Sequence, residues 1–401
     1  MIGLQEMRSL QSEEGLKALA AMAALPQELE IHKAISLMRK QFTPDLAGAA
    51  IEMTALRRRA RAKFVRADEM LFTAEALEQS SGEVLARYHA RRFADSGTVG
   101  DLCCGIGGDL IGLAGRGPAY GLDRDIVRLI GCRHNLEVYG EDADAFVALA
   151  DVMEPPLYVR SVFADPSRRS AGRRTRLADE YSPPLPFFEN MAKHLDSLWV
   201  KASPATEFPI LPGCERELVS LDRVCREMAL VWGDIAQPGR TATVLRRAAP
   251  GSWDISIHKL HADGVEDVSA PVLDHLPAQG TFLIEPDPAI VRARLIGVLA
   301  EEIGGVLVSQ EIAYLSCDSQ VVTPFGKAHR VEDSFPYNER ELRIWLAARG
   351  VGHLIVKKRG FPLSPEDVCA RMKLKGLESA TIILTRRGDR HIVIVLSSDG
   401  S

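Results

Sequence analysis

The chain has 401 residues, a length that exceeds one ordinary hydrophobic core and predicts two or three domains. Hydrophobic residues make up 46% and charged residues 26%, which excludes a disordered chain and favours a globular one. No stretch approaches eighteen consecutive apolar residues, and the first residues carry Glu6, Glu13 and Glu14 in place of an apolar core. We therefore expect a cytoplasmic protein with neither a signal peptide nor a membrane span.

The seven cysteines are odd in number and form no CxxC pair. This pattern supports neither a disulfide framework nor a zinc site, so we expect a reducing compartment and no metal. Cys103 and Cys104 are adjacent, and we interpret them first as small buried residues, with redox or nucleophilic work as the alternative.

The formal net charge of −5 is spread unevenly. From Gly326 to the end, 14 Lys and Arg residues stand against 9 Asp and Glu residues. A basic end on an acidic body favours a polyanionic partner at that end, although a solvated basic face is a common alternative.

Residues 1–95 are predicted to be helical, because apolar residues recur there at helical spacing. The segment 56–71 within this region is strongly basic. The segment 72–93 resembles one capped helix, with Thr73 as its N-cap and Glu75 in its first turn.

From residue 97 to about 262, apolar strands alternate with helical stretches. The expected strands are 98–104, 119–123, 145–151, 161–165, 197–203 and 242–248. This alternation predicts an α/β fold with a mostly parallel sheet covered on both faces, whose ligand lies at the carboxyl ends of the strands.

The rest of the chain is predicted to hold two α/β segments. Residues 281–304 fit a strand, a turn and a helix, with Asp287 as cap and Pro288 in the first helical position. From about residue 326 we expect a small unit with a helix over 338–350 and strands over 353–360, 379–388 and 390–398.

The glycine-rich run D-L-C-C-G-I-G-G-D spans residues 101–109. A dinucleotide fingerprint that starts at Gly105 requires glycine at position 110, where Leu110 stands. A pyrophosphate at a helix N-terminus disfavours nearby carboxylates, and here Asp101 and Asp109 flank the glycines. A ligand with an ammonium group and a sulfonium, such as S-adenosylmethionine, suits these charges better.

The run, followed by an acidic residue at the end of the second strand, resembles the S-adenosylmethionine site of class I methyltransferases. The resemblance implies that Asp123 accepts hydrogen bonds from the ribose and that Asp151 meets the adenine amino group. It places Asp101, Gly105 and Gly107 around the methionine end. The same resemblance assigns three neighbouring residues to the cofactor site: Cys103, Arg124 and Val152. The alternative is a Rossmann-like turn that holds no ligand.

A second motif, Asp165-Pro166-Ser167-Arg168, follows the expected fourth strand. It resembles the D-P-P-[YFW] motif of amino-methylating enzymes, but serine replaces the second proline and arginine replaces the aromatic residue. Asp165 can accept a hydrogen bond from a nucleophilic N–H, and Pro166 stiffens the loop. Arg168 and Arg169 can pair with phosphate or stack on a base. The alternative is a solvated basic loop with Asp165 as a helix cap.

Nearly the whole chain resembles a bacterial family of S-adenosylmethionine-dependent methyltransferases with a C-terminal THUMP-like domain. The core is also similar to trimethylguanosine synthase. The segments that carry the resemblance are KFVRADEMLFTAEALEQSS, DLCCGIGGDL, FADPSRR, VKASP, FLIEPDPAIVRA, VKKRG and ATIILTRRG. The resemblance implies a helical N-terminal domain over 1–95, a class I methyltransferase core over 96–325 and a THUMP-like domain over 326–401.

Because THUMP domains bind RNA, the resemblance implies methylation of a nucleobase nitrogen in RNA. It suggests that Thr73 holds the methionine carboxylate and that Lys201 contacts the substrate, each with a plain structural role as the alternative. The basic residues expected to bind RNA are Lys357, Lys358 and Arg359. Two other functions stay open: a methyltransferase for a small molecule or protein, and an RNA-binding protein with a non-catalytic S-adenosylmethionine site.

Five further side chains are interpreted as packing or surface residues. We expect His134 and Asn135 on the surface or in packing. We expect Tyr181, Phe187 and Phe188 in the core, with stacking on a base as the alternative. The sequence predicts no oligomeric state.

Overall fold

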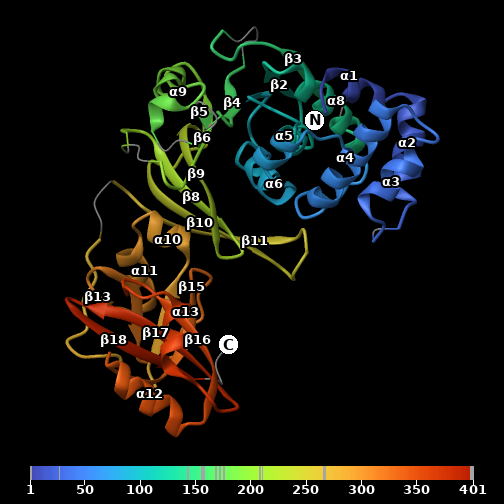
Figure 1. The fold of residues 1–401 in the computed structure, drawn as a ribbon. Helices are drawn as coiled ribbons and strands as arrows, with labels where there is room; N and C mark the ends of the chain where they lie inside the picture. Colours follow the sequence, from blue (N-terminus) through green and yellow to red (C-terminus); the bar gives the residue numbers. More distant parts are fainter. Residues whose placement is uncertain are drawn as a thin grey trace. The chain divides into compact units, whose positions relative to one another are not determined.

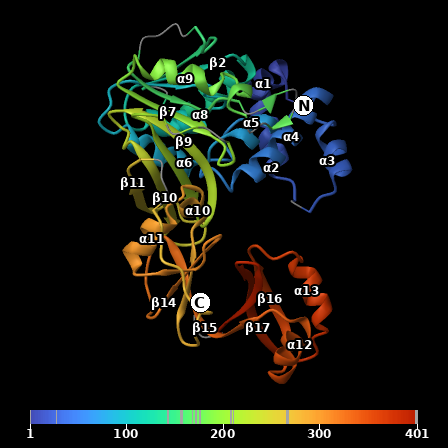
Figure 2. The ribbon, with the colours of Figure 1, turned by 90° about the vertical axis from the view of Figure 1, so that its left-hand side faces the viewer.

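The computed structural model describes residues 2–26, 28–141, 144–154, 159–167, 169–170, 173–174, 177–206, 209, 211–264 and 268–397. The chain divides into two compact units, which Figures 1 and 2 show as ribbons. The first unit comprises Met1–Glu215, Met228–Pro238 and Arg247–Ile255. The second comprises Arg216–Glu227, Gly239–Arg246 and Ser256–Ser401. The division into domains 1–95, 96–325 and 326–401 stays a prediction.

The N-terminal region is helical, as predicted. Its helices are α1 (Leu4–Leu10), α2 (Glu13–Ala23), α3 (Ile31–Met38), α4 (Pro44–Ala60), α5 (Ala74–Gln79) and α6 (Glu83–Arg92). Ser12 caps α2 by accepting from the Gly15 N–H, and Thr43 caps α4, whose first position is Pro44. Figure 1 shows α1–α4 gathered beside α8 (Ile126–Tyr139), and α1 contacts α8 directly.

The prediction of one helix over 72–93 is wrong, because the chain breaks between α5 and α6 at Ser80, Ser81 and Gly82. Serine and glycine are poor residues for a helix interior. The Lys63 ammonium binds the carbonyl oxygens of Leu77 and Ser80 at 2.7 and 2.8 Å, which satisfies the end of α5. The break frees Ser81 to turn its hydroxyl toward the glycine-rich loop.

A nine-stranded sheet follows, in the order β11-β10-β8-β9-β7-β4-β1-β2-β3. Its strands are β1 (Val99–Leu102), β2 (Ala119–Asp123), β3 (Ala145–Leu149), β4 (Ser161–Ala164), β7 (Ser197–Ala202), β8 (Glu215–Leu221), β9 (Val224–Gly233), β10 (Gly239–Arg247) and β11 (Ile255–Ala262). The neighbouring strands β3, β2, β1, β4 and β7 pair in parallel, as predicted, whereas β9 pairs with β7 in the antiparallel direction. Strands β8, β9 and β11 were not predicted from the sequence.

The centre of the parallel sheet is buried on both faces. Every residue of β1, β4 and β7 is buried, which explains their continuous apolar runs. Three helices lie along this part of the chain: α7 (Gly108–Ala114), α8 and α9 (Leu185–Ala192). The parallel strands all point the same way, so their carboxyl ends meet at one edge, and that edge carries the functional site.

The second unit contains a seven-stranded sheet in the order β13-β14-β12-β15-β18-β17-β16. Its strands are β12 (Phe282–Pro286), β13 (Val306–Ser309), β14 (Ile312–Cys317), β15 (Gly326–Pro336), β16 (Val351–Lys358), β17 (Glu378–Arg387) and β18 (Arg390–Leu396). The long strand β15 pairs with β12 through residues 326–330 and with β18 through 331–336. Strands from both sides of residue 326 therefore share one sheet.

The predicted strand, turn and helix over 281–304 form, but the helix is split. Asp287 caps α10 (Pro288–Arg292) by accepting from the Ala289 N–H, as predicted. Arg294 then adopts a φ of +57°, which ends α10 before α11 (Ile296–Ile303) begins.

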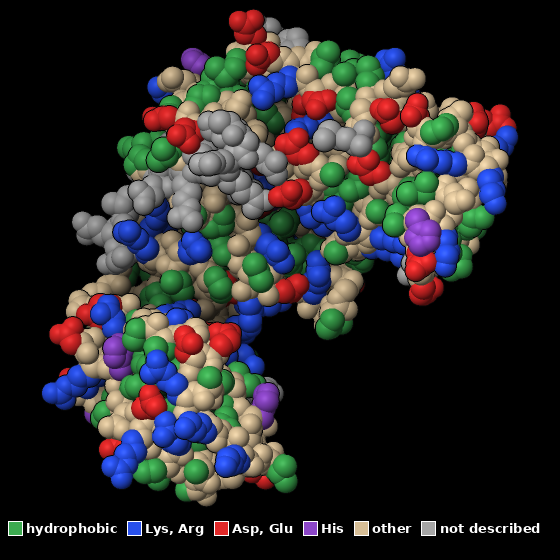
Figure 3. Space-filling model, viewed as in Figure 1, with side chains coloured by type: hydrophobic (Ala, Val, Ile, Leu, Met, Phe, Trp, Pro, Cys, Tyr) green, Lys and Arg blue, Asp and Glu red, His purple; other side chains and the backbone are tan. Residues whose placement is uncertain are grey.

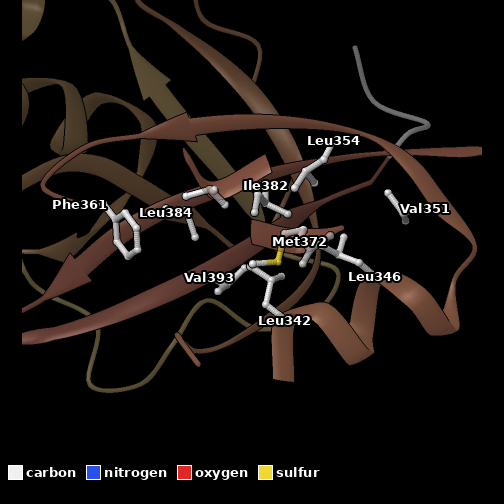
Figure 4. Packing of buried hydrophobic residues seen from close by; sticks show 11 residues of the cluster. Leu342, Leu346, Val351, Leu354, Phe361, Met372, Ile382, Leu384 and Val393 are labelled. Carbon is white, nitrogen blue, oxygen red and sulfur yellow. The ribbon is translucent and has the colours of Figure 1, made fainter. Parts of the chain in front are cut away.

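Two helices cover one face of the C-terminal strands. Figure 4 shows Leu342 and Leu346 of α12 (Glu339–Ala348) packed with Met372 of α13 (Pro365–Met372) against Ile382 and neighbouring strand residues. Alternate residues of β17 and β18 face this cluster, and the residues between them pack into a second cluster, which accounts for the continuous apolar runs of both strands. Within the described part of the chain, every helix is too short or too polar to cross a membrane.

Candidate functional site

A cavity of about 660 Å³ lies at the carboxyl ends of β1–β4, within the first unit. The fold brings together most residues that the sequence analysis assigned to cofactor or chemistry. Those that line the cavity are Asp101, Cys103, Gly105, Asp123, Arg124, Asp151, Val152 and Asp165. Parallel strands produce this convergence, because each of these residues follows or ends a strand.

The glycine-rich loop follows β1 and forms hydrogen bonds with the end of β2. The N–H of Cys103 donates to the carbonyl of Leu122 at 2.9 Å, and Cys103 itself has a φ of +70°, which is rare for a residue with a side chain. Gly107, with a φ of +84°, begins α7. A Cβ at Gly107 would meet the Cys132 sulfur at 2.8 Å, so glycine is required for packing, and Gly107 does not line the cavity.

Asp123 ends β2 and is buried to 5% exposure. One carboxylate oxygen accepts from the Gly105 N–H at 2.9 Å, and the other accepts from the Asp125 N–H at 2.9 Å. These bonds fix the carboxylate at the cavity wall. Each carboxylate oxygen has a second acceptor position, which suits a vicinal diol such as ribose.

Asp101 is the clearest candidate for holding a cation. Its side chain is 1% exposed, and neither carboxylate oxygen has a hydrogen-bond partner among the described residues. Burial raises the pKa of Asp101 well above its ordinary value, and the nearby Asp109, Cys132 and Asp165 raise it further. A buried, unpartnered carboxyl group in a cavity wall fits the ammonium group of S-adenosylmethionine.

Asp109 lines the cavity, but both of its carboxylate oxygens bond to protein groups. One oxygen lies 2.7 Å from His89 Nδ1, and the other accepts from the Ser81 hydroxyl at 2.6 Å. Burial alone would raise the pKa of Asp109, but His89, Lys201 and Ser81 outweigh it and lower the value. Its carboxylate is therefore committed to protein groups.

Asp165 stands at the end of β4, and the following loop turns sharply. Ser167 exchanges two backbone hydrogen bonds with Ser182, each 3.0 Å long, which holds Asp165 against the cavity. Pro166 is buried and lies outside the cavity lining. Arg168 lies outside the described residues. The structure describes only the backbone of Arg169, in a short strand β5 (Arg169–Ser170) paired with β6 (Arg173–Arg174).

Thr73 acts as the N-cap of α5, where its hydroxyl accepts from the Ala76 N–H at 3.2 Å. It does not line the cavity; Glu75, Ala76 and Gln79 of the same helix do. Glu75 also lies 3.6 Å from Arg128, another lining residue. The role predicted for Thr73 in binding the methionine carboxylate stays a prediction.

Several residues of the site escaped the sequence analysis. Asn135, interpreted as surface or packing, is fully buried and bonds to both backbone groups of Leu71 and to the Ile106 carbonyl. It thereby joins the segment before α5 to the glycine-rich loop. His89 and Ser81 are buried beside the cavity with no motif to mark them. Their polarity does not distinguish them, because polar residues are frequent throughout 72–93.

Tyr181 was interpreted as a core residue, and it is 3% exposed. Its hydroxyl lies 2.6 Å from Thr206 Oγ1 and accepts from the Ser203 N–H at 3.0 Å. The residue nevertheless contributes to the cavity wall. Phe188 is fully buried, as predicted.

The three basic residues predicted to bind RNA have partners within the second unit. Lys357 pairs with Glu285 at 2.6 Å. Arg359 donates to the Ala313 carbonyl at 2.6 Å and lies 4.7 Å from the Tyr314 ring centre. The exposed Lys358 reaches the Phe361 carbonyl at 3.4 Å. Figure 3 shows Lys and Arg scattered over the visible face of α12, α13 and the C-terminal strands, with Asp and Glu among them.

The ion pair with Lys357 contributes to a lowered pKa of Glu285. The His329 imidazole, 3.5 Å from the carboxylate, and the Lys357 ammonium, 2.6 Å from it, outweigh the effect of burial and lower the pKa of Glu285 to about 2. Among the residues that the structure describes, no group of three or more His, Cys, Asp or Glu side chains is arranged to hold a metal ion.

Three family models match parts of the chain. Residues 96–195 match the RNA cap guanine-N2 methyltransferase family, residues 326–398 the THUMP domain-like family, and residues 3–60 a domain of unknown function. A Mycobacterium tuberculosis protein named an uncharacterized S-adenosylmethionine-dependent methyltransferase is 32% identical over 364 residues. That similarity covers 88% of this chain and 96% of the relative.

One solved structure shows the fold of the whole chain. A Porphyromonas gingivalis protein, described as a candidate methyltransferase, aligns over 100% of both chains with a TM-score of 0.74. Only 17% of the residues are identical, so the likeness concerns the fold alone.

Proposed function

Because the chain belongs to the family of S-adenosylmethionine-dependent methyltransferases, we propose that it methylates a nitrogen of a nucleobase in RNA. The observation that carries the proposal is Asp165, which lines the cavity at the carboxyl end of β4 beside the cofactor residues. The matches to an RNA cap methyltransferase family and to a THUMP-like domain support RNA as the substrate.

The residues of the cavity would divide the work between cofactor and acceptor. Asp101 would hold the ammonium group of S-adenosylmethionine, Asp123 the ribose and Asp151 the adenine amino group. The cofactor supplies an electrophilic methyl group when it is bound, so the protein's main task is alignment. Asp165 would accept a hydrogen bond from the acceptor amino group and orient its nitrogen.

The proposal is tested by methyl transfer from radiolabelled S-adenosylmethionine to total bacterial RNA. Labelled nucleosides are then identified by chromatography and mass spectrometry. Label on a base nitrogen is the expected result. Label on protein or on small molecules, with none on RNA, would contradict the proposed substrate while leaving the methyltransferase activity intact.

Replacing Asp123 with alanine is expected to weaken binding of S-adenosylhomocysteine. The loss is on the order of 1.5–3 kcal/mol, because hydrogen bonds to a charged acceptor are lost. Isothermal titration calorimetry measures the change, with NAD as the competing ligand in the wild-type protein. Tighter binding of NAD than of S-adenosylhomocysteine would contradict the assignment of this cavity.

RNA binding is expected to depend on exposed lysines of the second unit rather than on Lys357 and Arg359, which have internal partners. Lys358, Lys373 and Lys375 are exposed. Alanine at all three should weaken binding and flatten the dependence of log Kd on log salt by about two units, since each phosphate contact on a single strand contributes about 0.7.

Fluorescence anisotropy with a labelled mixed-sequence RNA at several salt concentrations measures this slope. The control is the triple variant Lys17→Ala, Lys33→Ala and Lys193→Ala in the first unit, which should leave the slope unchanged. An equal loss in both triple variants would show that the second unit is not the specific contact.

A further inference from the structure

Lys201 lies at the end of β7 and is 9% exposed, so it is poorly placed to reach out to a large substrate. Its ammonium donates to Asp165 Oδ2 at 2.6 Å and to the Ser81 hydroxyl at 2.8 Å. These bonds direct the lysine to the residue at the end of β4 and to the turn between α5 and α6. The sequence motif around Asp165 contains no sign of either contact.

The hydrogen-bonded chain continues from Lys201 through Ser81 and Asp109, which both line the cavity, to His89. Ser81 donates to one oxygen of Asp109 at 2.6 Å, and His89 Nδ1 lies 2.7 Å from the other oxygen. His89 is fully buried on α6, and Asp109 is buried in the first turn of α7. Lys201 is therefore linked, directly or through Ser81, to the end of β4, the turn between α5 and α6, α6 and α7.

The electrostatic surroundings explain why a fixed cation is needed here. Burial raises the pKa of Asp101 well above its ordinary value, and the nearby Asp109, Asp165 and Asp123 raise it further. A buried carboxyl group in such company takes up a proton unless a cation compensates. Lys201 stands beside Asp165 and also lowers the pKa of Asp109.

We propose that Lys201 is a positioning residue for methyl transfer: its ammonium keeps Asp165 ionised and holds the carboxylate in one orientation toward the acceptor amino group. The inference rests on the proposed function only for the role of Asp165 at the acceptor. The ion pair between Lys201 and Asp165 forms without an acceptor, and so does the fixed orientation of the carboxylate.

The first test is steady-state kinetics of full-length variants on the RNA that the wild-type enzyme methylates. Lys201→Met is expected to lower kcat about 100-fold and to change KM for RNA less than about threefold, since orientation is lost and binding is kept. Lys201→Arg retains the cation and should recover at least about a tenth of the wild-type kcat. The control Lys193→Met replaces an exposed lysine bonded to Asn190 and should leave both constants unchanged.

The pH profile separates this role from simple loss of packing. In Lys201→Met the acidic limb of kcat should move to higher pH, because a carboxylate that loses its cation holds its proton more tightly. Asp101, Asp109 and Asp123 face the same region, as does His89 through Asp109, and all four remain in the variant. A uniform loss of kcat at every pH would overturn the proposal.

A double-mutant cycle on thermal unfolding tests the ion pair without any acceptor. Lys201→Met and Asp165→Asn should each lower Tm, and the double variant should be more stable than the sum of the two losses. Strictly additive losses would refute the inference even if the wild type methylates RNA. Coupled losses with no methylation of any RNA would instead refute the proposed function and leave the ion pair standing.

Discussion

Replacement of Asp165 by alanine is expected to reduce kcat for methyl transfer by about 100- to 10,000-fold, the range typical of a lost acid–base or orienting group. The carboxylate stands at the end of β4 and lines the cavity, where the acceptor nitrogen must approach. The affinity for S-adenosylhomocysteine should change less than tenfold, because Asp101 and Asp123 remain in place.

Single-turnover assays with labelled S-adenosylmethionine measure the chemical step, and calorimetry measures cofactor affinity on the same preparation. Asp196→Asn is a suitable control, because Asp196 is exposed and pairs with the exposed Arg160 outside the cavity. Near-normal turnover in the Asp165 variant would show that this residue is structural.

Replacement of Asp101 by asparagine is expected to weaken S-adenosylhomocysteine binding about 10- to 100-fold, since a hydrogen bond between two charged groups is lost. Asparagine has nearly the same shape, so the loop should keep its conformation. The unpartnered state of both Asp101 oxygens makes this residue the strongest candidate for the methionine ammonium.

The same residue predicts a pH dependence with a definite sign. Because the pKa of Asp101 is raised in the ligand-free protein, the carboxyl group holds a proton above its ordinary range, and an incoming ammonium favours its loss. Affinity should therefore rise with pH through that raised pKa, as long as the ligand's amino group stays protonated. Binding should release a proton, which calorimetry detects as a heat that varies with buffer ionisation enthalpy.

The control for Asp101 is Asp234→Asn, at an exposed position in the first unit. It should keep the wild-type affinity and proton release, whereas Asp101→Asn should lose the proton release. Proton release of equal size in Asp101→Asn and wild type would show that Asp101 is not the group that titrates.

The basic run over 57–66, which begins in the last turn of α4, has a structural use. Arg57 donates to the backbone carbonyls of Glu69 and Met70 at 2.9 and 2.8 Å, while Arg61 pairs with Asp68. Burial lowers the pKa of the Arg57 guanidinium despite these acidic neighbours. The same run of charges is typical of a phosphate-binding patch. Here Arg57 and Arg61 instead bind the segment 68–70, which leads to α5 and the cavity.

The sequence alone determined the local features of this protein, such as the acidic residues at strand ends and the glycine-rich loop. Strand ends followed by acidic residues, and a loop that needs positive φ at Gly105 and Gly107, are encoded within a few neighbouring residues. Parallel pairing then carries Asp101, Asp123, Asp151 and Asp165 to one edge by geometry alone. For this reason the α/β fold and the cavity could be predicted from periodicity and motif spacing.

Only the tertiary structure decided which polar groups meet across the fold. Lys201 and Ser81 are 120 residues apart in the chain, and Lys201 and Asp165 are 36 apart. A charged residue at a strand end has the same local pattern whether it reaches substrate or a neighbouring carboxylate. Asp109 bonds to His89, and Lys201 bonds to Asp165, because a buried charge is stable only when it is compensated. Which partner is available depends on how the elements pack.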